Sequence, residues 1–290
     1  MDMEKLLFKG YKTADNFAFN IEKCPLVGEF LEHNHDFSEL IIILKGTALH
    51  IVNGKEYFVK SGDAFIIQGD LSHGYKNVDN LEYINIMFNN SIVQQLSLLK
   101  KNKGFQALFY IEPFYRREQN FSSKLVLTPV QLKKVEAVAD LLIEEHKQNF
   151  DTSQAMISCN FTALLIMLSR NYSTNINEDN RKVLQMAEAM TFIEENFLDN
   201  INLSQLSELA CISSRHFVRI FKKNYKVTPM EYIIQMRLNH SAVLLKETSL
   251  PISLVATESG FNDHNYYSRK FREVFKVSPT LYRNSHVYVK

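Results

Sequence analysis

The last ninety residues contain one short pattern twice, and this duplication constrains the fold more than any other feature of the chain. The two copies, fifty positions apart, are Arg219-x-Phe221-(x)5-Val227-Thr228-Pro229-(x)2-Tyr232 and Arg269-x-Phe271-(x)5-Val277-Ser278-Pro279-(x)2-Tyr282. Agreement at one fixed offset indicates that a structural unit was duplicated. Each copy has a short apolar-periodic helix, a tight break and a helix carrying Arg and Lys. The chain is therefore predicted to contain two helix-turn-helix units.

The charge of the chain is distributed unevenly. Residues 201–290 hold 13 Lys and Arg against 6 Asp and Glu, a net charge of +7, whereas residues 1–200 hold 20 against 26, a net charge of −6. A basic third within a nearly neutral chain favours contact with a polyanion. A basic face that only keeps the domain in solution is the alternative for charge taken alone.

Length and composition limit the remaining possibilities. With 290 residues, of which 46% are hydrophobic, the chain can bury the cores of two domains. It has no run of eighteen apolar residues and no apolar stretch at its N-terminus, so we expect neither a membrane span nor a secretory signal, and a cytoplasmic protein. Cys24, Cys159 and Cys211 lack the Cys-x-x-Cys spacing of zinc or redox sites, and we expect reduced, structural thiols.

The first part of the chain reads as strands. From Gly28 to Phe88, short apolar segments alternate with turn residues every eight to twelve positions, which indicates a β-sandwich or barrel. Asn53-Gly54 between two such segments predicts a tight hairpin. After Pro129 the apolar spacing becomes helical, as in Leu132, Val135, Val138 and Leu142, and residues 156–169 form a second helical stretch.

These patterns predict an α+β protein of two domains. Residues 1–172 would form a barrel with appended helices, residues 173–182 a polar linker, and residues 183–290 an all-helical domain. In that last domain, Asn202 and Ser213 are predicted to cap helices, and Thr228-Pro229-Met230-Glu231 predicts a capping box that opens a long helix.

A helix that reads DNA needs side chains near its N-terminal half that reach base edges, and cations that meet phosphates. The apolar face of each helix must point inward, which leaves the opposite face for DNA. A solvated face is the alternative for any single cation. We expect DNA contacts from Ser214, Arg215, Val218, Arg219, Lys222 and Lys223 in the first unit, and from Asn262, Asp263, His264, Asn265, Ser268, Arg269, Lys270 and Arg272 in the second. The helix between the units would place them about 34 Å apart on one side of the duplex.

Residues Ile252 to Arg283 carry a longer motif. Val255-Ala256-(x)3-Gly260-Phe261-x-Asp263-(x)2-Tyr266-Tyr267-Ser268-Arg269-x-Phe271 and the following Val277-Ser278-Pro279-(x)2-Tyr282-Arg283 closely resemble the signature of AraC/XylS transcription regulators. The resemblance covers roughly residues 186–284. It implies two helix-turn-helix units joined by a helix, with Arg237 at a typical Arg position. Ser207 replaces the usual Ala and Cys211 the common Gly; we expect these departures to loosen the first turn without affecting the DNA-facing positions.

The N-terminal part resembles a second family. His33-x-His35-(x)3-Glu39-(x)6-Gly46 and Gly62-(x)10-His73-(x)3-Asn77 are similar to the two motifs of the cupin barrel. Residues at i and i+2 share a face of a strand, so His33 and His35, with Glu39 and His73, could surround a metal ion. Gln68 departs from the enzyme motif, and regulators often keep such histidines without metal. A polar lining for a small ligand and a structural role are the other interpretations, and we assign no metal and no cofactor.

The segment from His33 to Leu40, with Asn80-Leu81-(x)3-Asn85, is also similar to rhamnose-responsive members of the AraC family. A barrel lined by His, Glu, Gln and Tyr could bond sugar hydroxyls. We therefore expect an effector site that consists of His33, His35, Glu39, Gln68, His73 and Tyr75.

The sequence as a whole predicts a ligand-responsive, sequence-specific DNA-binding regulator of sugar or other carbon-source genes, and not an enzyme. Its expected partners are double-stranded DNA, a small effector and a second copy of the chain, with RNA polymerase as a further candidate. The apolar stripe of the helix at residues 129–147 is expected to mediate dimerisation, unless it packs on its own barrel. The effector is expected to order the N-terminal arm, residues 1 to about 24. The alternative function is a metal-dependent cupin enzyme fused to a DNA-binding domain.

Overall fold

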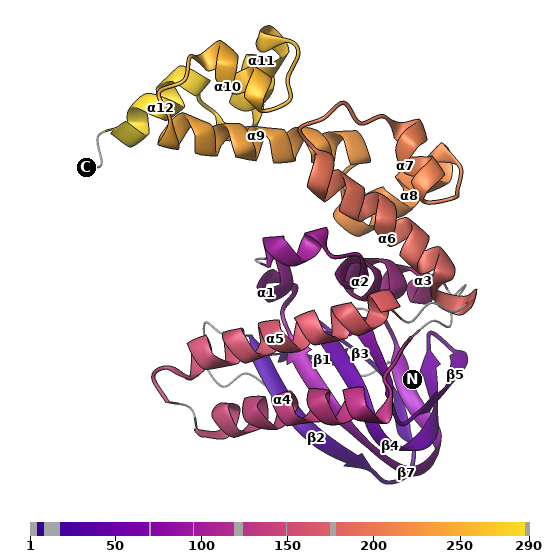
Figure 1. Cartoon of the computed structure of the whole chain (residues 1–290). Helices are drawn as coiled ribbons and strands as arrows, with labels where there is room; N and C mark the ends of the chain where they lie inside the picture. The colour runs from indigo at the N-terminus through magenta and orange to yellow at the C-terminus, as the bar shows by residue number, and fades with distance from the viewer. Residues whose placement is uncertain are drawn as a thin grey trace. The chain divides into compact units, whose positions relative to one another are not determined.

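The computed structural model describes residues 5–8, 18–69, 71–94, 96–118, 124–148, 150–174 and 178–287. The chain divides into two compact units, residues 1–191 and 192–290, and Figure 1 shows the strands in the first and helices alone in the second. The predicted order of a strand-rich part followed by an all-helical part is confirmed. Among the helices of these described stretches, none is long and apolar enough to span a membrane.

The N-terminal unit is built on a mainly antiparallel sheet. Its strands are β1 (Lys5–Leu6), β2 (Phe19–Leu26), β3 (Phe30–His35), β4 (Ser38–Val52), β5 (Lys55–Lys60), β6 (Asp63–Gln68), β7 (His73–Phe88) and β8 (Leu125–Val126). The long strand β4 pairs with β5, β6 and β7, while β1 adds to β3 in parallel. Asn53 and Gly54 both have positive φ, 47° and 74°, and join β4 to β5 in the predicted hairpin.

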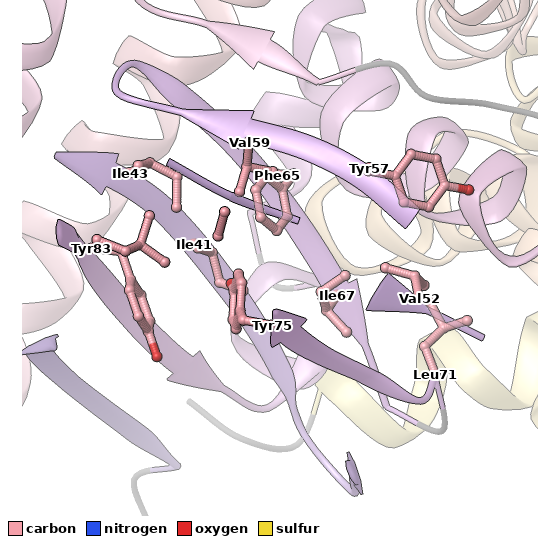
Figure 2. Packing of buried hydrophobic residues seen from close by; sticks show 12 residues of the cluster. Ile41, Ile43, Val52, Tyr57, Val59, Phe65, Ile67, Leu71, Tyr75 and Tyr83 are labelled. Carbon is pink, nitrogen blue, oxygen red and sulfur yellow. The ribbon is translucent and has the colours of Figure 1, made fainter. Parts of the chain in front are cut away.

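Both faces of β4 are buried in its first half because each face packs against a different layer. On one face, Ile41 and Ile43 join Phe65, Ile67 and other side chains in the core between the strands (Figure 2). On the other side of the sheet, the Phe161 ring lies 5.2 Å from Phe19 and 5.4 Å from Phe88. The second layer therefore consists of helices, which explains why β4 starts as a continuous apolar run.

Helices follow the barrel strands in the N-terminal unit. They are α1 (Asn90–Gln94), the 3-10 helix η2 (Ser97–Lys101), α2 (Lys103–Gln106), the π-helix η3 (Ala107–Ile111), α3 (Glu112–Arg117), α4 (Pro129–Gln148), α5 (Ser153–Thr174) and α6 (Glu178–Asn196), which crosses into the second unit. The two helices predicted after Pro129 are confirmed as α4 and α5. The short helices from Asn90 to Arg117 had no equivalent in the sequence prediction.

The apolar stripe of α4 does not lie free on the surface. Val135 and Leu142 are fully buried within the single chain, and α4 packs against β2 and α5. The alternative interpretation of this stripe, packing on its own domain, is therefore correct, and the prediction that it forms a dimer interface is wrong. An amphipathic helix buries its apolar side first against its own core.

The predicted linker at 173–182 is largely helical. Helix α5 continues to Thr174 and α6 begins at Glu178, both within the range predicted as a linker. The boundary between the two compact units falls inside α6, after Thr191. The polar composition of this segment had predicted a linker. An exposed helix face is polar as well, so composition alone does not separate the two.

The C-terminal unit consists of α7 (Leu203–Leu209), α8 (Ser214–Tyr225), α9 (Pro229–Glu247), α10 (Ile252–Glu258), α11 (His264–Phe275) and α12 (Pro279–Val287), after the end of α6. Asn202 accepts a hydrogen bond from the Gln205 amide (2.9 Å), and Ser213 accepts one from that of His216 (3.3 Å). Thr228 and Glu231 form the full capping box, so the three predicted helix starts are confirmed.

Both helix-turn-helix motifs have an arginine contact with the helix before them, although Arg237 and Arg283 do not lie at the fifty-residue offset of the repeat. Arg237 of α9 donates to the carbonyls of Phe197 and Asp199, each at 2.6 Å, just after α6. Arg283 of α12 donates in the same way to Leu245 (3.4 Å) and Leu250 (2.7 Å) at the end of α9. Each helix-turn-helix therefore has one helix before it and one after it, and an arginine of the later helix binds carbonyls at the end of the earlier one. Helix α9 follows the first helix-turn-helix and precedes the second.

Candidate functional site

The helices α8 and α11 each present one apolar and one polar side. Phe217, Ile220 and Phe221 of α8 are buried, as are Tyr267 and Phe271 of α11. The predicted contact residues lie on the other side. Exposed among them are Arg215, Arg219, Lys222, Lys223, Asn262, His264, Asn265, Arg269 and Arg272, while Ser214, Val218, Ser268 and Lys270 are half-buried. The structure therefore places every predicted contact residue outside the helical core.

Arg219 and Arg269 occupy equivalent positions and have equivalent neighbours. A guanidinium nitrogen of Arg219 lies 3.2 Å from Nε2 of His216, three residues earlier. The Arg269 guanidinium lies 5.4 Å from the ring centre of Tyr266, again three residues earlier. A ring at this place restricts where the arginine can point, which suits a side chain that must meet a base edge.

Two charged residues of the second unit have partners within their own helix. The Asp263 carboxylate accepts from the amides of Asn265 (2.8 Å) and Tyr266 (3.0 Å) and caps α11. It is therefore a capping residue, which differs from the base contact that we expected. Lys270 donates to Glu273 at 2.6 Å, so part of its charge is neutralised before it meets any phosphate.

The two departures in the first helix-turn-helix have different effects on it. Ser207 Oγ lies 2.9 Å from Ser214 Oγ and donates to the Ser204 carbonyl at the same distance, which ties α7 to the start of α8. Cys211 adopts a left-handed conformation, with φ of 54°, and ends the turn where glycine has no steric penalty. Ser207 therefore ties the turn, whereas Cys211 adds backbone strain to it, and the expected loosening stays a prediction for Cys211. Ser207 also contacts Ser214, a predicted DNA-facing residue.

The barrel brings together three of the four residues predicted from the cupin motifs. His35, Glu39 and His73 are buried, and one ligand atom from each lies within 4.8 Å of the others. Glu39 Oε2 is 3.2 Å from His73 Nε2 and 3.6 Å from His35 Nε2. His33 lies beside them, with its ring centre 4.4 Å from that of His73, but it is not a member of this close group.

Glu39 is the anion of this group. Burial raises the pKa of Glu39, but the charge of His73 and the hydrogen bond from Asn85 oppose it and the pKa is lowered to about 2. Burial lowers the pKa of His73 to about 3, against the opposing charge of Glu39. At neutral pH Glu39 is therefore a carboxylate and His73 is neutral. The carboxylate accepts a hydrogen bond from Asn85 Nδ2 at 3.0 Å.

A cavity of about 210 Å³ opens beside this group. Its lining consists of Leu6, Glu22, Cys24, Phe30, His33, Glu39, Ile41, His73, Tyr75, Tyr83, Asn85 and Met87. Asn85 Oδ1 and the Tyr75 hydroxyl are buried and have no hydrogen-bond partner among the described residues. Unpartnered polar atoms of this kind are costly unless something meets them, so they mark the wall that a ligand would contact.

Two residues predicted for the cavity do not line it. Gln68 donates to the Phe109 carbonyl of η3 at 3.0 Å, because it follows Ile67 on β6 and so points to the opposite face of the strand. His35 is held behind the cavity, where Nδ1 lies 2.8 Å from the Phe37 carbonyl.

The sequence prediction missed Glu22, Cys24, Tyr83 and Asn85, which come from β2 and β7. Strand register explains their position, because Asn85 pairs with both Glu22 and Ile41, and Tyr83 pairs with both Cys24 and Ile43. Period-two alternation along β7, from Tyr83 through Asn85 to Met87, was visible in the sequence. Its orientation toward a cavity was not, because that depends on which strands pair.

These features define a protein of two functional parts: a barrel with a small polar cavity, and a basic unit with duplicated helix-turn-helices. Residues 21–150 match the family described as AraC-like ligand binding domain, and residues 206–285 match the family described as helix-turn-helix domain. The chain belongs to the AraC family of ligand-responsive, DNA-binding transcription regulators.

Known relatives align along most of the chain. It is 25% identical over 268 residues to the HTH-type transcriptional activator RhaS of Escherichia coli O1:K1, covering 92% of each chain. It is 26% identical over 284 residues to the HTH-type transcriptional activator RhaR of Shigella dysenteriae serotype 1, covering 97% of this chain and 96% of the relative. The C-terminal domain of the response regulator yesN from Fusobacterium nucleatum is 34% identical over 33% of this chain and 93% of its own, with a TM-score of 0.32.

Proposed function

We propose that the barrel cavity binds an uncharged, hydroxyl-rich small molecule, a sugar, and that this effector controls sequence-specific DNA binding. The observation that carries the proposal is the character of the cavity wall. The Glu39 carboxylate and Asn85 Oδ1 accept hydrogen bonds, and the Tyr75 hydroxyl can donate or accept one. Sugar hydroxyls supply donors for such a wall.

Charge and size narrow the class of ligand. Glu39 is ionised at neutral pH and Glu22 also lines the cavity, so a carboxylate or phosphate on the ligand would meet like charge. A volume of about 210 Å³ is smaller than the roughly 300–1,000 Å³ typical of drug-sized ligands, and it suits a single sugar ring. The similarity to rhamnose-responsive regulators makes L-rhamnose the first compound to test.

The N-terminal arm could couple effector binding in the cavity to a change in DNA binding. Leu6 of β1 lines the cavity and pairs with His35 of β3, and the Phe8 amide donates to Asp36 at 2.7 Å. Residues 1–4 and 9–17 of the predicted arm lie outside the described residues. We propose that a bound sugar contacts Leu6 and orders the arm, which can shift DNA affinity by no more than the sugar's differential affinity for the two states.

For the DNA-binding unit we propose double-stranded operator DNA as the partner, read by α8 and α11. Helix α9 has 19 residues and is about 28 Å long, which supports a spacing near one duplex turn. The relatives named transcriptional activators support activation and contact with RNA polymerase. Because these relatives are bacterial regulators, we place the protein in the cytoplasm and propose that it is not an enzyme.

The proposed active form is a homodimer, through a different face from the predicted stripe. On α4, Leu141 is 54% exposed, and on the adjacent α5, Met156 is 51% exposed. The two helices lie side by side along the sheet (Figure 1). Exposed apolar side chains on paired helices suit burial against a second copy.

A metal-dependent enzyme remains the second candidate, because the donor set fits an ion. His35 Nε2 and His73 Nε2 are 3.2 Å apart, near the separation of about 3.4 Å for two nitrogens that bind zinc tetrahedrally at about 2.1 Å. With Glu39 they would hold zinc, iron or manganese, and such an ion would supply Lewis-acid chemistry.

Calorimetry on the full chain separates the two candidates. We expect L-rhamnose or another neutral monosaccharide to bind, and Tyr75→Phe to weaken it by about 1 kcal/mol, while Gln68→Ala, outside the cavity, leaves it unchanged. Binding of zinc, iron or manganese with turnover of a substrate would favour the enzyme. No binding by any neutral sugar, with basal DNA affinity intact, would overturn the proposed effector class.

A further inference from the structure

A histidine that lies behind the cavity has no role in the function described above. His50 of β4 is fully buried and does not line the cavity. Its Nε2 lies 3.3 Å from Nδ1 of His73. Its ring stacks on Tyr75 at 4.7 Å and lies 4.8 Å from the ring of Phe65. His50 is therefore held rigidly between two cavity residues and the barrel core.

The hydrogen bonds of His50 select one arrangement of protons. Its Nδ1 is buried and has no hydrogen-bond partner among the described residues, so a proton there would lack an acceptor. A neutral His50 therefore carries its proton on Nε2 and donates it to His73 Nδ1. His73 must then carry its own proton on Nε2, the atom that faces Glu39 Oε2 at 3.2 Å.

The opposite arrangement, in which His73 carries its proton on Nδ1, is unfavourable both at Glu39 and at His50. If His73 donated from Nδ1 to His50, the lone pair of His73 Nε2 would face the Glu39 carboxylate. His50 would also bury an N–H with no acceptor. The other neighbour of His73 Nε2 is His35 Nε2, at 3.2 Å. That atom is an acceptor, because His35 uses Nδ1 to donate to the Phe37 carbonyl.

We propose that His50 is a positioning residue for the effector cavity, which fixes His73 as a donor to Glu39 and so holds the carboxylate where a ligand meets it. The predicted change in effector affinity rests on the proposed function. The direction of the hydrogen bonds from His50 to His73 and from His73 to Glu39 can be measured without any ligand. A partner that orients a binding residue typically changes affinity by tenfold or more when it is lost.

Arg116 of α3 supports this arrangement from the far side of the cluster. Its guanidinium is buried, and Cζ lies 5.0 Å from the ring centre of Phe65, the ring that also contacts His50. The Arg116 side chain therefore helps to hold the Phe65 ring against His50. The charged or titratable groups that act on His50 are His73, Arg116, His33 and Lys124.

Two substitutions test the proposal. His50→Gln keeps an amide donor that can reach His73, whereas His50→Phe keeps a planar ring without a donor. In ligand-free full-length protein, nitrogen NMR shifts are expected to show His73 protonated on Nε2 in the wild type and in His50→Gln. In His50→Phe we expect the Nε2 form to persist, because Glu39 still favours it, but the His73 ring to lose its fixed orientation, so that its Nε2 proton exchanges faster with solvent. L-rhamnose affinity is expected to fall about tenfold in His50→Phe and to change little in His50→Gln.

The outcomes separate the inference from the proposed function. If the His73 Nε2 proton exchanges equally slowly in the wild type and in folded His50→Phe, the positioning role is excluded. If the wild type shows the expected protonation but binds no neutral sugar, the proposed effector fails and the hydrogen-bond assignment stands. Thermal melting of each variant monitors folding. If His50→Phe does not fold, a nitrogen–nitrogen scalar coupling between His50 Nε2 and His73 Nδ1 in the wild type still decides, because its absence overturns the proposal.

Discussion

Ser207 of α7 and Ser214 of α8 share a hydrogen bond of 2.9 Å between their hydroxyls, which links the two helices of the first helix-turn-helix. The second helix-turn-helix has Thr257 and His264 at the equivalent offset of fifty, where Thr257 Oγ1 lies 3.4 Å from His264 Nε2. Both turns therefore have a polar contact between their two helices. In each motif the contact includes a predicted DNA-contact residue, Ser214 or His264.

We expect Ser207→Ala to destabilise the C-terminal unit by about 1 kcal/mol, the usual net value of one hydrogen bond. Chemical denaturation followed by circular dichroism measures this change. Ser204→Ala is the matched control, because Ser204 is exposed and its hydroxyl donates only to Glu208 at 3.0 Å. Equal losses of stability in the two variants would show that the contact between Ser207 and Ser214 does not stabilise the turn.

A substitution at Cys211, in the same turn, is expected to change stability in the opposite direction. Cys211 has a φ of 54°, so Cys211→Gly relieves a left-handed conformation and is expected to leave stability unchanged or to raise it by up to about 1 kcal/mol. A clear loss of stability in this variant would show that the Cys211 side chain has a packing role.

The cations of α8 and α11 are expected to differ in their effect on DNA binding. Arg219→Ala and Arg269→Ala should each weaken specific operator binding by about 1–3 kcal/mol, as base-reading residues do. Lys222→Ala should lower the slope of log affinity against log salt by about one unit for all sequences. Lys270→Ala should lower it less, because Glu273 already holds that ammonium. Gel-shift titrations at several salt concentrations test this; unaltered affinity in both arginine variants would refute the assigned faces.

Arg116 and Glu112 form a buried ion pair on α3, at 2% and 1% exposure of their side chains. Arg116→Met leaves the Glu112 carboxylate buried without its cation, and we expect a loss of about 3–5 kcal/mol in unfolding free energy. The double variant Arg116→Met with Glu112→Met should recover most of this loss. Urea unfolding of the three proteins provides the comparison, and a double variant no more stable than the single one would contradict the pairing.

Glu112 also predicts how stability depends on pH. Burial raises the pKa of Glu112 to about 7, although the Arg116 charge opposes this, compared with 4.5 in the unfolded chain. The folded state therefore binds more protons between these values, so this contribution to stability is full below pH 4.5 and is lost as pH rises through 7. Glu39 has the opposite sign, because its pKa is about 2, and its contribution is lost as pH falls from 4.5 toward 2. Glu112→Gln should flatten the unfolding free energy across pH 4.5–7; an unaltered profile would mean that Glu112 does not titrate there.

For the proposed dimer, Leu141→Glu and Met156→Glu should raise the dissociation constant by tenfold or more without unfolding the chain, because both side chains are exposed. Val135→Glu is the contrasting variant and should unfold the unit, since Val135 is fully buried. Sedimentation with circular dichroism separates the two effects. A wild-type chain that stays monomeric at micromolar concentration, with and without DNA, would contradict dimerisation.

Local signals in the sequence were sufficient for the helical unit. The capping residues Asn202, Ser213 and Thr228 each accept a hydrogen bond from the amide three residues later, so each helix start could be predicted from the local sequence. The duplicated aromatic positions also fixed the inward faces, because Phe221 meets Tyr232 and Phe271 meets Tyr282 at equivalent places in both copies.

The cavity depended on contacts that no local pattern contains. Motif spacing and strand alternation act over a few residues, so the sequence was enough to predict a strand-rich part, a helical part and the cluster of His35, Glu39 and His73. The DNA-contact faces stay a prediction. Only the tertiary structure decided that Asn85 and Tyr83 join the cavity, that Gln68 turns away, and that the apolar side of α4 covers its own barrel. The physical reason is that strand pairing and layer packing set which face is enclosed, and a shift of one residue in register would exchange the two faces.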